Sequence, residues 1–223
     1  MDIELAIPVS SRDGAFGRLE DVVIDPRTLR LTHLVVQPED HSHRARLVSI
    51  DGVGPDQRPG ALVLDCTGDE LERSAAIQET AYLRMGELPS AGPDWSVGIQ
   101  EMYSMPEYGT LGPEIMGVGT TMEFDQHIVV GFHRIPRGEV EIRRSSAVTS
   151  HDGHHLGHVL GFAIDDQALI TELILEHGHM WTKRMVAIPG AAIERCEMDE
   201  LTLNMTSDQV GGLKSLPGHR RFG

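Results

Sequence analysis

Histidines are the residues of this sequence whose type and spacing could do chemistry. Neutral imidazole is the commonest metal ligand in proteins, and it titrates near physiological pH. Two imidazoles from one turn and one from a nearby loop would make a three-histidine site with an open coordination position. Six histidines gather in this way, four in one short stretch and two in a later loop: His151, His154, His155, His158, His177 and His179.

Three interpretations of this histidine cluster stay open. It is an exposed group that binds nothing, a three-histidine metal site with its ligands among the five histidines other than His151, or a pH-sensitive contact. A similar stretch near the N-terminus has no histidine, which favours the first interpretation. The residues in that region are Arg12, Ala15, Phe16 and Arg18.

Patterns typical of enzymes are missing from the sequence. It contains neither G-x-S-x-G nor H-E-x-x-H, and residues 112–118 have P-loop spacing except that Val118 stands where the phosphate-binding lysine belongs. Cys66 and Cys196 form no C-x-x-C pair, so we expect two unreactive thiols rather than a disulfide or a zinc site. The sequence predicts a protein that is not an enzyme and uses no cofactor.

The stretch that carries the histidines occurs twice in the chain. In both copies an Asp-Gly turn precedes a glycine and an apolar strand that ends in Asp, and the copies lie about 139 residues apart, as Asp13 and Asp152 show. An internal repeat of this kind predicts two similar structural units. Four further blocks match in the same order: 31–36 with 170–175, 47–50 with 185–188, 62–64 with 201–203, and 67–71 with 206–210.

Each copy has the pattern of a small antiparallel β-barrel. Residues 3–9 alternate between apolar and other side chains, residues 31–37 are rich in β-branched residues, and turn signals separate the strands. Gly17 and Gly157 each open a strand after a turn, which predicts positive φ or close backbone packing at one or both. Thr67 and Thr206 begin capping boxes, so a short helix should end each copy. The first helix is predicted to continue through residues 75–83.

The fold class is therefore mainly β, with two small antiparallel barrels in tandem, joined by a helix and a long Gly/Pro/Met-rich linker. The predicted units are residues 1–73, 74–146 and 147–223. Residues 86–122 are expected to form an irregular linker with few contacts to either barrel core. This linker is either a plain tether or a docking arm anchored by Trp95, Tyr103 and Tyr108.

The matched blocks resemble the PRC-barrel family, named from the cytoplasmic domain of the photosynthetic reaction centre H subunit. The resemblance covers residues 1–73 and 147–213 and implies the barrel fold. The same barrel occurs in a ribosome maturation factor, where it docks a ribosomal protein, so the resemblance also implies protein binding. It rests on Asp13-Gly14, Gly17, Asp25, 31–36, 48–50 and 67–70, and in the second copy on Asp152-Gly153, Gly157, Asp165, 170–175, 186–189 and 206–209.

Composition limits the partners of this chain of 223 residues. Its formal net charge is -15, and acidic residues outnumber basic ones in all three predicted units, so we expect no nucleic-acid binding. No apolar run has the roughly 20 residues of a membrane span, and no signal peptide is visible, so we expect a cytoplasmic protein without an integral membrane segment. The predicted function is protein interaction or assembly with a protein partner of unknown identity. Because small barrels bury little surface, a homodimer that covers the apolar part of the linker is also expected.

Overall fold

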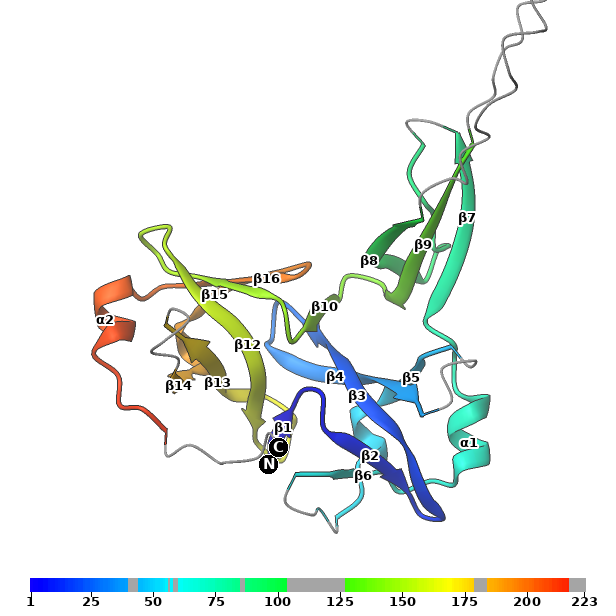
Figure 1. Cartoon of the computed structure of the whole chain (residues 1–223), viewed down its shortest axis with the longest axis horizontal. Helices are drawn as coiled ribbons and strands as arrows, with labels where there is room; N and C mark the ends of the chain where they lie inside the picture. Colours follow the sequence, from blue (N-terminus) through cyan, green and yellow to red (C-terminus); the bar gives the residue numbers. More distant parts are fainter. Residues whose placement is uncertain are drawn as a thin grey trace, which may run out of the picture.

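The structure is a computed structural model that describes residues 1–39, 44–55, 57, 60–84, 87–103, 127–178 and 184–216. The part described is mainly β, as predicted, and consists of one seven-stranded, one six-stranded and one three-stranded sheet with two short α-helices (Figure 1). None of its helices combines the length and the apolar character that crossing a membrane requires.

The two larger sheets have matching strand orders, which confirms the internal repeat. The first runs β5 (Arg46–Ser49), β4 (Arg30–Pro38), β3 (Gly14–Asp25), β2 (Pro8–Ser11) and β6 (Leu62–Val63). The second runs β14 (Arg184–Pro189), β13 (Ile170–His177), β12 (His155–Ile164), β11 (Ala147–Thr149), β16 (Glu200–Leu203) and β15 (Ile193–Glu197). Each sheet contains one parallel pair of neighbouring strands, β2 with β6 in the first sheet and β11 with β16 in the second. Among the described residues neither sheet has its two end strands paired with each other.

The two halves exchange their first strands. β1 (Asp2–Glu4) pairs with β12 of the second sheet, and β10 (Val140–Arg143) pairs with β3 of the first. The registers correspond, because Ile3 lies opposite Phe162 and Ile142 lies opposite Val22. Each half therefore completes the sheet of the other, an arrangement that local sequence patterns did not predict.

A reciprocal pair of hydrogen bonds joins the halves at the opposite turns. The Leu31 N–H donates to the Ala168 carbonyl at 2.9 Å, and the Ile170 N–H donates to the Leu29 carbonyl at 3.0 Å. Leu29 and Ala168 both have positive φ, 57° and 59°, although neither is glycine. The matching contacts give the two halves an approximate two-fold relation.

One apolar core spans both halves. Leu19 and Leu34 of the first sheet and Phe162 and Leu173 of the second are all fully buried members of it. Units of about 70 residues bury a modest share of their surface alone, so a shared core buries more apolar area. The expectation of two separate barrel cores is therefore corrected to one continuous core.

The predicted capping boxes are confirmed at α1 (Gly68–Arg73) and α2 (Ser207–Gly211). The Thr67 hydroxyl accepts from the Glu70 N–H at 3.3 Å, and the Glu70 carboxylate accepts from the Thr67 N–H at 2.8 Å. The turn aspartates add a contact that the sequence did not predict. Asp13 accepts from the N–H of Gly68 at 2.8 Å, and Asp152 accepts from the N–H of Ser207 at 3.0 Å. The Asp-Gly turn of each copy thus holds the start of its helix.

The glycine prediction is also confirmed. A Cβ at Gly17 would stand 2.0 Å from the Gln37 carbonyl oxygen, and one at Gly157 would stand 1.9 Å from the Glu176 carbonyl oxygen. Gly157 also has a φ of 147°. Only a residue without Cβ fits where these strands cross their neighbours so closely.

The region predicted as helix and linker contains a third sheet, in the order β7 (Gln78–Arg84), β9 (His127–Pro136), β8 (Trp95–Tyr103). The continued helix is wrong: α1 ends at Arg73, and residues 78–84 pair with β9 from end to end. Part of the predicted irregular linker is strand β8, while residues 104–126 lie outside those described. This sheet stands off from the other two at the upper right of Figure 1.

The base of the three-stranded sheet packs on the first sheet through Ile77 and Ile135, which lie outside the predicted linker of residues 86–122. Alternate residues of β3 face opposite sides: Val22 and Ile24 enter the main core, while Val23 enters a second apolar cluster. This second cluster forms between the first sheet and the base of the three-stranded sheet. Its members are Val23, Val35, Ala45, Leu47, Ile77 and Ile135, with Trp95 packed against them.

Candidate metal-ligating site

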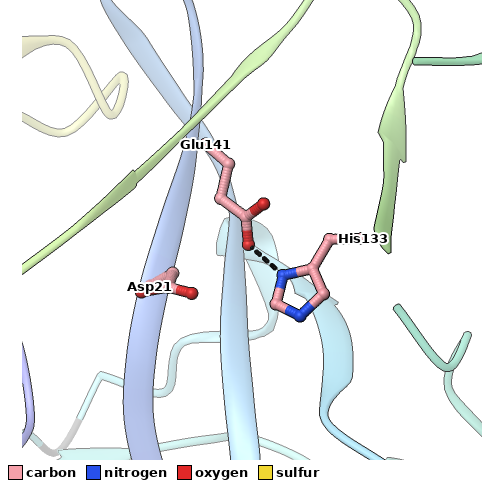
Figure 2. A group of neighbouring side chains, drawn as sticks. All are labelled: Asp21, His133 and Glu141. Carbon is pink, nitrogen blue, oxygen red and sulfur yellow. Dashed lines mark hydrogen bonds and ion pairs between the residues drawn. The ribbon is translucent and has the colours of Figure 1, made fainter. Parts of the chain in front are cut away.

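Three side chains that can bind a metal ion meet beside the second apolar cluster (Figure 2). They are Asp21 on β3, His133 on β9 and Glu141 on β10. Their potential ligand atoms all lie within 4.8 Å of one another. Asp21 is 4% exposed, Glu141 is 0% exposed and the His133 side chain is 12% exposed. The group is therefore almost closed to bulk water.

The strand arrangement explains why these residues meet. Side chains two residues apart on a strand share a face, so Asp21 points to the same side of β3 as Val23. Glu141 lies opposite Val23 in the pairing of β10 with β3 and shares that side. The three-stranded sheet covers it and brings His133. The site thus depends on the strand exchange and on the third sheet together.

Glu141 is held by two hydrogen bonds. His133 Nδ1 lies 2.7 Å from its Oε1, and the Ile99 N–H donates to its Oε2 at 3.0 Å. The pairing of β8 with β9 shifts register between Val97 and Gln100, so Ile99 lies in a β-bulge. A Cβ at Gly98 would stand 2.6 Å from Glu141 Oε2, so glycine lets the bulge approach the carboxylate. Such bulges commonly re-aim groups next to functional sites.

Asp21 has an unusual electrostatic environment. Burial, followed by the neighbouring Glu141 charge, raises the pKa of Asp21 to about 9. Arg143 lies opposite Asp21 in the strand pairing, but its guanidinium binds Asp199, with Nε 2.9 Å from Asp199 Oδ1 and a second contact from Nη2. Without a metal ion in the site, Asp21 therefore carries a proton at neutral pH.

Two surface hollows lie beside the site. Asp21 lines a groove of about 810 Å³ between the two halves, which Arg144, His158 and Glu176 also line. His133 lines a separate hollow of about 190 Å³. One imidazole and two carboxylates are a ligand set for divalent metal ions. The same imidazole and carboxylates can share a proton instead of a metal ion.

The histidine cluster of the second half does not converge in the same way. His155 and His158 have ring centroids 5.1 Å apart, but His158 Nδ1 donates to the Ser145 carbonyl at 3.0 Å. His177 Nδ1 donates to the Leu156 carbonyl at 2.8 Å.

The remaining predicted histidines add no convergent ligand set. His154 is exposed, and His151 Nδ1 lies 3.5 Å from the Glu194 carboxylate. Among the described residues these histidines belong to no group of three potential ligands, and His179 lies outside that part.

The predicted partner anchors have different environments. Trp95 is half-buried and packs on the second apolar cluster, with the Arg134 guanidinium 4.5 Å from its ring centroid. Its ring therefore anchors the three-stranded sheet to the rest of the chain. The Tyr103 side chain and the whole of Tyr108 lie outside the described residues.

The two cysteines are free thiols. Burial raises the pKa of Cys196 to about 12, so this thiol is unreactive at neutral pH. The desolvation of half-buried Cys66 raises its pKa as well.

The sequence contains one further signal for the site. Asp21 precedes three apolar residues, and Glu141 stands between Val140 and Ile142, so both acids lie in strands with strongly apolar neighbours. An apolar run indicates a strand buried on both faces, and an acid within it needs a partner.

Neither a protein-family model nor a curated protein matches this sequence.

Proposed function

We propose that this protein is a non-enzymatic interaction and assembly module of the PRC-barrel type. In this proposal the two halves are tandem barrels, and the chain works in the cytoplasm as a homodimer that also binds a protein partner. The repeat resemblance supports the barrel assignment, because the matched strands follow the same order in both halves. The three-stranded sheet is the proposed self-association element.

The observation that carries this proposal is the unpaired outer edge of the three-stranded sheet. Within the described residues β7 pairs only with β9, and Tyr82 on β7 is 76% exposed. Leu88, shortly after β7, is 84% exposed. An open strand edge offers backbone donors and acceptors to another strand. A free edge with large exposed apolar side chains therefore fits strand addition.

A second copy of this chain is the occupant that we propose for this edge. The chain has a net charge of -15, which opposes self-association in general. β7 is an exception, because Gln78–Arg84 contains one acid, Glu79, and one base, Arg84. Two copies of an edge strand can pair antiparallel about a two-fold axis, the commonest symmetry of soluble oligomers.

Light scattering coupled to size-exclusion chromatography tests this proposal. The chain mass is 24.5 kDa, so a dimer should have twice that mass, about 49 kDa. Tyr82→Lys should shift the protein towards the monomer, since lysine on an edge strand opposes pairing. Met198→Lys is the matched control, because Met198 is also exposed but lies in the second sheet's β15–β16 turn. A mass near 24.5 kDa at every concentration would refute self-association.

A further inference from the structure

The two halves of the chain provide an internal comparison for the buried acids. In the strand exchange Arg143 lies opposite Asp21, while the matching residue Glu4 lies opposite Gly161. Glu141 lies opposite Val23, while the matching residue Asp2 lies opposite Ala163 and is exposed. The same strand exchange thus forms in the second sheet without a buried acid pair. The strand exchange by itself does not require Asp21 and Glu141.

The two acids lie together in a buried part of the molecule. Asp21 is more than nine-tenths buried, and its carboxyl has another acid, Glu141, as its side-chain hydrogen-bond partner. The guanidinium of Arg143, which lies opposite Asp21 in the strand pairing, is bound to Asp199. Buried carboxylates are costly unless a cation or hydrogen-bond donors compensate them. A cation between Asp21 and Glu141 would therefore offset the cost of burying both.

We propose that Asp21, His133 and Glu141 bind one divalent transition-metal ion, of which Zn²⁺ is the representative. Zn²⁺ binds imidazole nitrogen and carboxylate oxygen at roughly 2.0–2.2 Å, so two ligand atoms of a tetrahedral site lie about 3.3–3.6 Å apart. The ligand atoms here lie within 4.8 Å of one another, so small side-chain shifts suffice. Three protein ligands leave one coordination position open.

The surrounding contacts suit such an ion. The 2.7 Å contact between His133 Nδ1 and Glu141 Oε1 marks where the ion would replace a shared proton. The Ile99 N–H donates to Glu141 Oε2, and this hydrogen bond orients the carboxylate so that Oε1 faces the site. Mg²⁺ should bind more weakly, because it prefers oxygen ligands in octahedral geometry.

A bound ion would connect all three strands that supply the site. Asp21 and Glu141 belong to the first sheet, and His133 belongs to the projecting three-stranded sheet. The ion would fix the base of the projecting sheet to the body of the molecule. This inference does not depend on the proposed dimer, since all three ligands come from one chain.

Metal binding to the full-length, untagged protein tests the inference. The protein is stripped with a chelator, and Zn²⁺ or Mg²⁺ binding is followed by isothermal titration calorimetry and by elemental analysis after dialysis. We expect one Zn²⁺ per chain and at least ten-fold weaker Mg²⁺ binding. Asp21→Asn, His133→Gln and Glu141→Gln should each weaken Zn²⁺ binding at least ten-fold. Co²⁺ should give visible absorption bands that the same variants lose.

The double variant His154→Ala/His155→Ala is the matched control, because it removes two exposed histidines that line neither of the hollows beside the site. Its Zn²⁺ affinity should equal that of the wild type. Absence of stoichiometric Zn²⁺ in the wild type would overturn the inference. So would unchanged affinity in the site variants, or loss of binding in the histidine control. Circular dichroism checks folding, and if Glu141→Gln unfolds, the near-isosteric Asp21→Asn variant decides.

Discussion

Replacing Asp21 by Asn should change how the stability of the metal-free protein depends on pH. Asp21 is buried beside Glu141, and its pKa is raised from 3.8 to about 9. The folded protein therefore binds one more proton at this residue than the unfolded chain between those two pH values. Asn has nearly the same shape, and its amide can donate to Glu141 as the protonated carboxyl does.

The direction and the size of the change in unfolding free energy with pH follow from this difference in bound protons. Stability falls as pH rises wherever the folded state binds more protons, by about 1.4 kcal/mol per pH unit for one proton. Below pH 3.8 the carboxyl is protonated in both states, so this loss begins above that value and ends near pH 9. Between pH 5.5 and 7.5 the wild type should lose about 3 kcal/mol of unfolding free energy relative to Asp21→Asn.

Urea denaturation at several pH values, with a chelator present, measures this difference. The two curves should diverge steadily, with the variant becoming the more stable protein towards pH 7.5. Asp166→Asn is the matched control, because it makes the same change at an exposed position and should leave the pH slope close to that of the wild type. Parallel curves for the wild type and Asp21→Asn would refute the reasoning about the buried proton.

Three further substitutions, each with a comparison variant, test the local structure by urea denaturation. Gly157→Ala should cost more than about 2 kcal/mol, because its Cβ would stand 1.9 Å from a backbone oxygen. Gly211→Ala, with no atom within 4 Å, should stay within about 0.5 kcal/mol of the wild type, and equal losses would contradict the packing argument. Thr206→Ala should cost about 1 kcal/mol by removing the α2 cap, while Thr206→Ser should retain it; an unchanged Ala variant would count against the cap. Ala6→Gly should stabilise the protein by up to about 1 kcal/mol, because φ is 66° there and Ala6 is only half-buried. Ala147→Gly in β11, also at a half-buried position, should destabilise it, and an equal loss at both positions would contradict the strain at Ala6.

Features that depend on short-range patterns could be predicted from the sequence. The repeat, the strand-rich fold, both capping boxes and the close packing at Gly17 and Gly157 follow from local alternation, caps and turns. The helix beyond Arg73 failed for the same reason. Residues 75–83 contain several helix-favouring side chains, but pairing of Gln78–Arg84 with β9 decides the outcome. Strand preference depends strongly on such tertiary context.

Pairing partners could not be predicted in the same way. The alternation in residues 3–9 shows which side chains are buried, but it is the same whichever sheet the strand joins. His133 and Glu141 are 8 residues apart, but Asp21 is far from both in the sequence, and the three meet only through the exchanged strand and the third sheet. The histidine cluster was visible because its members are close in sequence. Closeness in sequence did not bring its described members into one coordination sphere.

The exchanged strands also have a consequence for the order in which the protein can fold during its synthesis. β3 lacks its partner β10 until residues 140–143 have left the ribosome. β1 lacks its partner β12 until residue 163 has also left the ribosome. At roughly 5–20 residues per second, the first strand waits about 8–32 s. The first half must therefore keep an open edge through most of translation. A ribosome-bound chain that ends before residue 140 should be more sensitive to protease than the released protein.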